Sequence, residues 1–276
     1  MRRTAQEAFP LALTSLMERH QTTSANVALS GRQIEHESAS VPIGWPECIW
    51  IVRHGESEGN VASRMAQQMG MSDFNIGVED ALVQLTPHGL AQATAVGRWF
   101  AAMQPEKRPT VVLSSPYLRA QHTAERIIAA GGIAALDGRI IPDDRFREQN
   151  SGCFERLTPK GIEQRFPREA ELQRLLGRFH YRPPGGENWC DVIVRLCGAM
   201  DTIRKRYSGE RVLIVTHKWV ILCLRYLLES RSERETLTLA LVDVPNCSLT
   251  SYVMMHSCHF KQLALKDANL VVCPSK

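Results

Sequence analysis

The sequence lacks the short motifs that mark common metal and nucleotide sites. It has no C-x-x-C pair and no His-Glu-x-x-His segment, so neither of these zinc-binding patterns is present. It also has no Walker-type glycine-rich loop, which disfavours a kinase activity. We therefore expect no metal ion and no cofactor.

Long apolar runs and blocks of one charge are also missing. The most apolar segment, residues 212–228, contains a histidine, a lysine and an arginine, which would be costly to place in lipid. The amino terminus has two arginines but no uninterrupted apolar core after them, which argues against a secretory signal. Lysine and arginine are scattered and the net charge is only +4, so composition does not predict nucleic-acid binding. We expect neither a membrane nor a nucleic acid as partner.

The eight cysteines are spread through the chain. Several lie in apolar, periodic segments, where a free cysteine behaves as a small hydrophobic residue. An even count is weak evidence for disulfides in a chain of this length. We therefore predict reduced thiols in a cytoplasmic protein, with disulfide pairing as the alternative.

Length and composition predict one large domain with an appendage. A chain of 276 residues with 44% hydrophobic and 22% charged residues is ordinary for a globular protein. One α/β domain of roughly 200 to 250 residues is expected at this length. Residues 1–46 are mostly polar, with helical periodicity only at 9–17. We predict a poorly ordered amino-terminal extension over 1–46 and a folded domain over 47–276.

Short apolar segments alternate with helical patterns from residue 47 onward. Four apolar runs have the length and β-branched content of buried strands. The segments between them carry apolar residues at helical spacing, and Thr86-Pro87 reads as a helix cap followed by proline. This alternation predicts a three-layer α/β/α sandwich with a mostly parallel central sheet. The predicted strands are residues 48–52, 110–113, 140–141 and 212–215, with 247–255 and 260–272 as a final pair at one edge, and the predicted helices are residues 87–103, 118–130, 187–207 and 219–228, with a helical start after 57.

Three of the predicted strands end in polar residues suited to anion chemistry. Arg53-His54 follows the first strand, Ser114-Ser115 with Arg119 follows the second, and Thr216-His217 follows the fourth. The carboxyl ends of parallel strands share one edge of the sheet, where ligands bind in open α/β folds. We therefore expect two histidines and two arginines to converge there, although each alone would have an ordinary structural explanation.

These motifs resemble those of the histidine phosphatase superfamily, the phosphoglycerate mutase-like proteins. The resemblance spans roughly residues 47–255 in the family's order, and several motifs that occur together are far more specific than one. Its details are nearest to the broad-specificity phosphatase-like branch. The matching segments are Arg53-His54-Gly55-Glu56-Ser57 with Asn60, Ser114-Ser115-Pro116-Tyr117-Leu118-Arg119-Ala120 with Thr123-Ala124, Arg147-Glu148-Gln149 with Gly152, Phe154 and Glu155, Gly177-Arg178-Phe179-His180-Tyr181-Arg182, Gly185-Gly186-Glu187 with Asp191 and Arg195, Thr216-His217, and Pro245-Asn246-Cys247-Ser248.

Two positions depart from the family's pattern. Lys218-Trp219 follows the second histidine, where many members have Gly-Gly or Gly-Asn. Arg156 follows Glu155, where many members have glycine. These changes leave the predicted catalytic residues intact and bear on substrate choice.

The resemblance and the chemistry assign the same roles. His54 is the predicted nucleophile, and its ring must be neutral because the attacking nitrogen needs a lone pair. Arg53 and Arg119 favour that neutral form by charge repulsion, and their guanidinium groups suit the equatorial oxygens of a transferring phosphoryl group. Glu148 is the predicted proton donor to the leaving group and then the base that activates water. His217 is expected to donate to the phosphoryl group, and the predicted substrate-binding residues are Asn60, Ser57 and Lys218.

We predict a metal-independent phosphatase that hydrolyses phosphomonoesters of small metabolites through a phosphohistidine on His54. A phosphoglycerate mutase-type transfer is the first alternative, because it shares the first half-reaction and returns the phosphoryl group to a bound hydroxyl. A noncatalytic phospholigand-binding protein is the second, although such a protein has no need of both a nucleophilic histidine and a proton-donating glutamate. The expected partner is a phosphorylated small molecule, and a homodimer is left open as the assembly.

Overall fold

A computed structural model describes residues 44–254 and 260–262 of the chain. The extension predicted over 1–46 falls almost wholly outside these residues, and so does the part of the last predicted strand that follows residue 262. Within the described part, strands and helices alternate in the order expected from the sequence.

A six-stranded sheet lies at the centre of the described residues. Its strands are β1 (Cys48–Arg53), β2 (Val111–Ser114), β3 (Ile140–Pro142), β4 (Arg211–Thr216), β5 (Leu249–Met254) and β6 (Phe260–Gln262). Their order across the sheet is β3-β2-β4-β1-β5-β6. The first four strands are parallel, whereas β5 is antiparallel to β1 and β6 is antiparallel to β5. The prediction of a mostly parallel sheet is confirmed.

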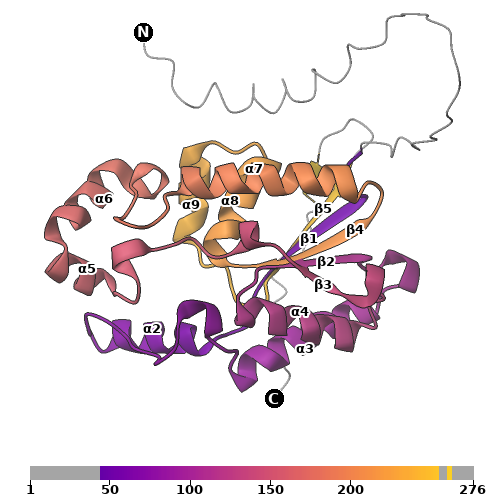
Figure 1. The fold of residues 1–276 in the computed structure, drawn as a ribbon, viewed down its shortest axis with the longest axis horizontal. Coiled ribbons are helices and arrows are strands. Elements are labelled where there is room, and N and C mark those ends of the chain that lie inside the picture. The colour runs from indigo at the N-terminus through magenta and orange to yellow at the C-terminus, as the bar shows by residue number, and fades with distance from the viewer. Residues whose placement is uncertain (1–43, 255–259, 263–276) are drawn as a thin grey trace, which may run out of the picture. The chain divides into compact units, whose positions relative to one another are not determined.

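Helices cover both faces of this sheet. Within the described residues they are α2 (Glu58–Gln68), α3 (Pro87–Ala101), α4 (Leu118–Gly131), α5 (Pro159–Arg165), α6 (Pro167–His180), α7 (Trp189–Arg206), α8 (Lys218–Leu228) and α9 (Glu233–Leu241). The α3–α4 pair lies on one face, and α7 and α8 lie on the other (Figure 1). The predicted three-layer α/β/α sandwich is therefore confirmed. None of these helices combines the length and the apolar character that a membrane span requires.

Helix starts follow local signals in the sequence. Thr86 caps α3 and Pro87 takes its first helical position, as predicted. The helix α7 begins at Trp189, two residues later than its periodicity suggested, because Asn188 is the cap and its side chain accepts a hydrogen bond from a backbone N–H in the first turn. The cap residue thus decides the start of the helix more sharply than the apolar pattern does.

The apolar periodicity does not predict α5, α6 or α9. Each of these helices has a single buried residue, namely Gly161, Phe179 and Thr236. A helix with so little buried surface shows no apolar stripe in its sequence. In addition, α6 is kinked at Gly177, where φ is +71°, which interrupts its 3.6-residue pattern.

Both faces of the sheet are packed with large side chains. All six residues of β1 are buried, as its continuous apolar run predicts. Trp50 meets Phe100 of α3 edge to face, with ring centroids 5.3 Å apart. On the helix α7, Trp189 is fully buried and its ring centroid lies 5.3 Å from that of Phe179. Because each such side chain stabilises the fold by about 1.5–3 kcal/mol, the strand ends are held by a rigid core.

The first turn of α3 lies directly on the segment that follows β1. A Cβ atom added at Gly89 would lie 2.1 Å from the carbonyl oxygen of Glu56. The same carbonyl accepts a hydrogen bond of 2.9 Å from the backbone N–H of Thr86. Only glycine allows this approach, so Gly89 seats α3 against the turn that carries His54 and Gly55.

Replacing Gly89 with alanine is expected to lower the free energy of unfolding by about 1–3 kcal/mol, because backbone atoms have to move apart. The matched control is Gly198→Ala in α7, where an added Cβ would meet only the Arg145 guanidinium at 3.8 Å. This control should raise stability by about 0.5–1 kcal/mol, since alanine favours a helix interior over glycine. Urea denaturation measures both changes, and equal stability of the two variants would contradict the close contact.

Candidate active site

The ends of three neighbouring strands bring the predicted residues to one place. Backbone pairing continues one residue beyond the strands, because His54 N donates to Thr216 O at 2.9 Å and Ser115 N donates to Val215 O at 3.0 Å. The side chains that follow β1 and β4 are therefore adjacent. The ring centroids of His54 and His217 lie 5.1 Å apart.

His54 is buried and its ring is held in one tautomer. Its Nδ1 lies 2.7 Å from the carbonyl oxygen of Gly55, which can only accept, so Nδ1 carries the proton and Nε2 carries the lone pair. The pKa of His54 lies well below its ordinary value, chiefly because of burial and then because of the charges of Arg119 and Arg53. A neutral ring with an available Nε2 is what nucleophilic attack requires.

His217 is fully buried and pairs with a serine that the sequence analysis did not assign a role. Its Nε2 lies 2.8 Å from Ser115 Oγ, which also accepts from the backbone N–H of Tyr117 at 3.2 Å. Burial, followed by the charge of Arg119, holds the pKa of His217 well below its ordinary value. Among the described residues its Nδ1 has no partner. If the Ser115 hydroxyl donates to Nε2, the proton sits on Nδ1, which is then a neutral donor for an oxygen in the site.

The two arginines are buried and are held by carboxylates and carbonyls from distant loops. Arg119 donates through Nη1 to the carbonyl oxygen of Asp80 at 2.5 Å and through Nη2 to the Asp80 carboxylate at 2.9 Å. Arg53 donates through Nη1 to Val244 O and lies 3.9 Å from the Asp243 carboxylate. Only 8% of Arg53 and 5% of Arg119 are exposed, so two positive charges adjoin the neutral histidine with little water around them.

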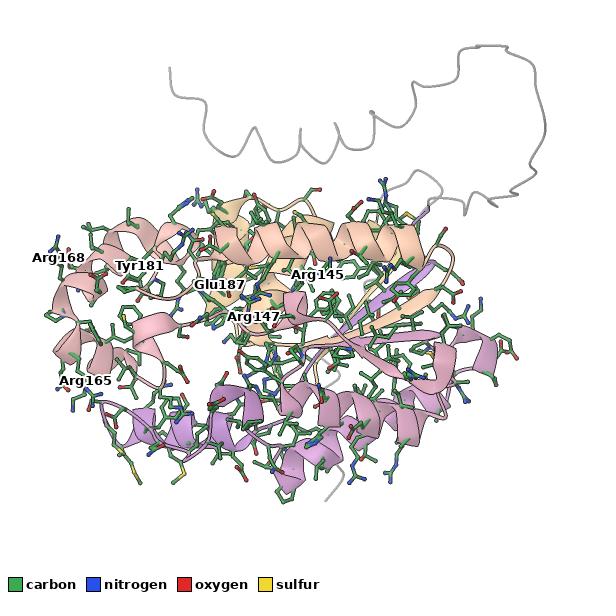
Figure 2. The ribbon with its side chains drawn as sticks, in the orientation of Figure 1. Arg145, Arg147, Arg165, Arg168, Tyr181 and Glu187 are labelled. Atoms are coloured by element: carbon green, nitrogen blue, oxygen red, sulfur yellow. The ribbon has the colours of Figure 1, made fainter. Side chains whose placement is uncertain are left out.

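Glu148 lies in a loop that Glu187 anchors. The carboxylate of Glu187 accepts from Arg147 Nη2 at 2.8 Å and from the backbone N–H of Asn150 at 3.0 Å, and its carbonyl accepts from Gln149 Nε2 at 2.6 Å. Figure 2 labels Arg147 and Glu187 where this loop meets the start of α7. The Gly185-Gly186-Glu187 motif thus acts on the site indirectly, by setting the position of residues 147–150.

The carboxyl group of Glu148 is poised to exchange a proton near neutral pH. Burial raises its pKa to about 7, against the opposing influence of a hydrogen bond from Gln149 N and of the charges on Arg119 and Arg53. The carboxylate of Asp80 acts in the same direction as burial. A group with this pKa can donate a proton in one step and accept it in the next.

Two of the three predicted substrate-binding residues form the cap of α2. Ser57 Oγ accepts from Asn60 N at 3.2 Å, and Asn60 Oδ1 accepts from Ser57 N at 3.1 Å. Asn60 Oδ1 also accepts from Asn246 Nδ2 at 3.0 Å. With its oxygen bound twice, the Asn60 amide has its Nδ2 group left as the donor for a ligand.

Residues 243–248, which we name the 243–248 turn, surround the Arg53-His54 backbone. Asn246 Nδ2 donates to His54 O at 3.0 Å, and Cys247 N donates to Arg53 O at 3.0 Å. Cys247 has a φ of +56°, an uncommon conformation that this pairing holds in place. In the sequence this segment is only a mark of the family resemblance, and its Pro245 is the available signal for a turn.

Lys218, the third predicted substrate-binding residue, begins α8 directly after His217. Its Nζ lies 2.8 Å from Asp243 Oδ1 and 5.2 Å from the centroid of the Trp219 ring. Asp243 therefore links Lys218 to Arg53.

Among the described residues, no group of three or more His, Cys, Asp or Glu side chains is placed to hold a metal ion.

Replacing Glu148 with glutamine is expected to stabilise the fold more at pH 8 than at pH 5. A carboxyl group whose pKa is raised on folding stabilises the fold below its unfolded pKa, and this contribution is lost as the pH rises through about 7. Glutamine has no proton to lose, so it avoids that loss. Urea denaturation at the two pH values measures the difference, with Glu125→Gln on the exposed surface of α4 as the control. An equal gain at both pH values would contradict the raised pKa.

The chain matches known proteins along most of its length. A family model described as histidine phosphatase superfamily (branch 1) matches residues 49–267. The chain is 29% identical over 196 residues to a metal-independent phosphoserine phosphatase of Arabidopsis thaliana, covering 71% of this chain and 74% of that protein. It is 29% identical over 207 residues to a probable phosphoglycerate mutase of Yersinia pestis, covering 73% and 82%. It spans only 36% and 38% of the length of two longer curated relatives.

A solved structure has the same fold. The protein YhfR of Bacillus stearothermophilus superimposes with a TM-score of 0.62 at 26% identity, covering 80% of this chain and 96% of that one. The matched range includes Arg53, His54, Arg119, Glu148 and His217. The resemblance seen in the sequence is confirmed: the chain belongs to the histidine phosphatase superfamily, in which its relatives include both phosphatases and a probable mutase.

Proposed function

We propose that this protein hydrolyses phosphomonoesters of small metabolites through a covalent phosphohistidine on His54. The observation that carries the proposal is the state of that ring: it is buried, neutral and hydrogen-bonded through Nδ1, so that Nε2 keeps its lone pair beside two buried arginines. A scattered set of cysteines in apolar segments supports a cytoplasmic setting for this activity.

In the first step, the Nε2 lone pair of His54 attacks phosphorus and the bond from phosphorus to the ester oxygen breaks. The electron pair of that bond stays on the ester oxygen, which takes the proton of Glu148 and leaves as an alcohol. Arg53 and Arg119 bind the equatorial oxygens, whose negative charge is spread in the transition state. His217 Nδ1 and Asn60 Nδ2 add neutral donors.

In the second step, water replaces the alcohol. The Glu148 carboxylate takes a proton from the water as its oxygen bonds to phosphorus. The bond from phosphorus to nitrogen breaks, and its electron pair returns to His54 Nε2. Inorganic phosphate leaves, and both residues regain their starting protonation. A pKa of about 7 suits Glu148 to both roles.

The proposed reaction needs no metal ion. Two guanidinium groups supply the positive charge that a metal would otherwise place on the phosphoryl oxygens. The name of the Arabidopsis relative, a metal-independent phosphoserine phosphatase, supports this part of the proposal and makes phosphoserine a natural substrate to include in a screen.

A phosphoglycerate mutase activity is the second candidate, and the Yersinia relative favours it. The mutase would use the same first step and then return the phosphoryl group to a hydroxyl of the bound acid. Lys218 and Trp219 stand where many family members have a glycine pair, and the bulk of these side chains, with Lys218 paired to Asp243, leads us to favour hydrolysis.

Replacing His54 with alanine is expected to lower kcat for 4-nitrophenyl phosphate by about 10³-fold or more, since the group that carries the phosphoryl intermediate is lost. The matched control is His88→Ala, an exposed histidine of α3, which should keep the wild-type rate. Quenching with an alkaline denaturant and labelled substrate should trap a phosphoryl group on wild-type His54 that is stable in alkali and lost in acid, and EDTA should leave the rate unchanged. Hydrolysis that survives in the alanine variant refutes the nucleophile, and loss of activity in EDTA refutes metal independence.

The mutase candidate is tested with 3-phosphoglycerate, with and without its bisphosphorylated primer. We expect release of inorganic phosphate at a rate that does not depend on the primer, because water completes the cycle. Coupled assays for phosphate and for 2-phosphoglycerate separate the two reactions. Primer-dependent isomerisation that is much faster than phosphate release would assign the mutase activity instead.

A further inference from the structure

Asp80 lies in contact with the clamp arginine on α4, although no role was predicted for it. It begins a short 3-10 turn, Asp80–Leu82, in the segment between α2 and α3. Both its carbonyl oxygen and its carboxylate accept hydrogen bonds from Arg119, at 2.5 and 2.9 Å. The two guanidinium nitrogens at the end of Arg119 are thus fixed by one residue, and the Arg119 side chain also stacks on Tyr117 at 4.9 Å.

This contact orients Arg119 without using up its donors. A guanidinium group has five N–H donors, and Asp80 takes two of them, so three are left for phosphoryl oxygens. A guanidinium fixed in this way loses less conformational freedom when the anion binds. Arg53 is held similarly by Val244 and Asp243, so each of the two arginines is paired with a carboxylate.

Asp80 also acts electrostatically on the predicted proton donor, Glu148. The charged groups that act on Glu148 come from three elements: Arg53 from β1, Arg119 from α4 and Asp80 from its 3-10 turn. The neighbouring polar groups include the Gln149 N–H, which donates to the Glu148 carboxyl, and the Tyr117 hydroxyl and Cys223 thiol, whose pKa values Glu148 helps to raise. The two arginines favour loss of the Glu148 proton, and of the groups that act on Glu148, Asp80 is the carboxylate that opposes them.

We propose that Asp80 is a positioning residue for phosphoryl transfer: its oxygens set the orientation of Arg119, and its carboxylate, 2.9 Å from Arg119 Nη2, offsets a positive charge that would otherwise favour early loss of the proton that the leaving oxygen takes from Glu148. This inference rests on the proposed phosphatase mechanism. It concerns the step in which the ester bond breaks, the electron pair moves to the ester oxygen and the Glu148 proton follows. It predicts that Asp80 matters most for substrates whose leaving group needs that proton.

Two substitutions separate the two roles. Asp80→Asn removes the charge but keeps an amide oxygen that can accept from Arg119 Nη2, whereas Asp80→Ala removes both. The Asp80 side chain is 45% exposed, so its charge is partly screened and we expect an effect below about tenfold from the asparagine variant. The matched control is Glu79→Gln, because Glu79 is the adjacent, exposed carboxylate.

The experiment measures kcat/KM against pH for the full chain with an alkyl phosphate, glycerol 2-phosphate, and with 4-nitrophenyl phosphate. For Asp80→Asn we expect the alkaline limb of the kcat/KM profile for the alkyl phosphate to move to lower pH by less than about one unit. Because of this shift, kcat/KM for the alkyl phosphate at pH 7.5 should fall by about two- to fivefold. The aryl phosphate should change little, because nitrophenolate leaves without a proton. Asp80→Ala should lose activity on both substrates and bind inorganic phosphate more weakly. Glu79→Gln should match the wild type.

Other results would overturn the inference. An unshifted alkaline limb in Asp80→Asn, or equal losses on both substrates, would show that Asp80 does not hold the Glu148 proton. Tighter binding of inorganic phosphate to Asp80→Ala would show that Asp80 competes with the anion for Arg119. A ¹³C NMR titration of the Glu148 carboxyl in wild type and Asp80→Asn tests the same coupling without turnover. An equal Glu148 pKa in the two proteins would refute the Asp80 inference. A wild-type chain with no phosphatase activity would instead refute the proposed function.

Discussion

The structure depends on two positive charges that are buried next to two neutral imidazole rings. Arg53 and Arg119 are almost fully shielded from solvent, and their charges add to burial in keeping His54 and His217 unprotonated. Removing guanidinium groups from water is unfavourable unless acceptors replace it. The other residues of the site supply acceptors that stabilise these two charges and fix the two guanidinium groups in position.

The acceptors come from loops that are distant in sequence and close in space. Asp80 binds Arg119, and the 243–248 turn binds Arg53 through Val244 O while its Cys247 pairs with the Arg53 carbonyl. Glu187 holds the Glu148 loop through four hydrogen bonds, one of them from its own N–H to Asn150 O. Each of these contacts fixes a side chain of the candidate site before a ligand arrives, which lowers the reorganisation needed in the proposed phosphoryl transfer. The sheet supplies the rigid frame from which these loops start.

The same arrangement explains why the pKa of Glu148 is raised to about 7. Its surroundings remove water, and the two arginines limit how far the pKa rises. Asp80 offsets part of their influence. A proton that is neither firmly held nor firmly lost suits the proposed role of Glu148 as acid in one step and base in the next. The balance is set by three charges on three separate elements and could be shifted by changing any one of them.

The sequence by itself determined the fold class, the buried strands, the family and the residues that gather at the strand ends, because apolar runs, caps and the Arg-His-Gly and Thr-His motifs are local patterns. It did not reveal α5, α6 or α9, since each buries one residue and so leaves almost no apolar stripe. Nor did it reveal Asp80, or the contacts that give Ser115 and Asn246 their roles. Their importance arises from hydrogen bonds to residues tens or hundreds of positions away, and no periodicity records such a contact. Only the tertiary structure, which brings these distant segments together, decided which acceptor binds each arginine. The arginine charges in turn influence the protonation of His54, His217 and Glu148.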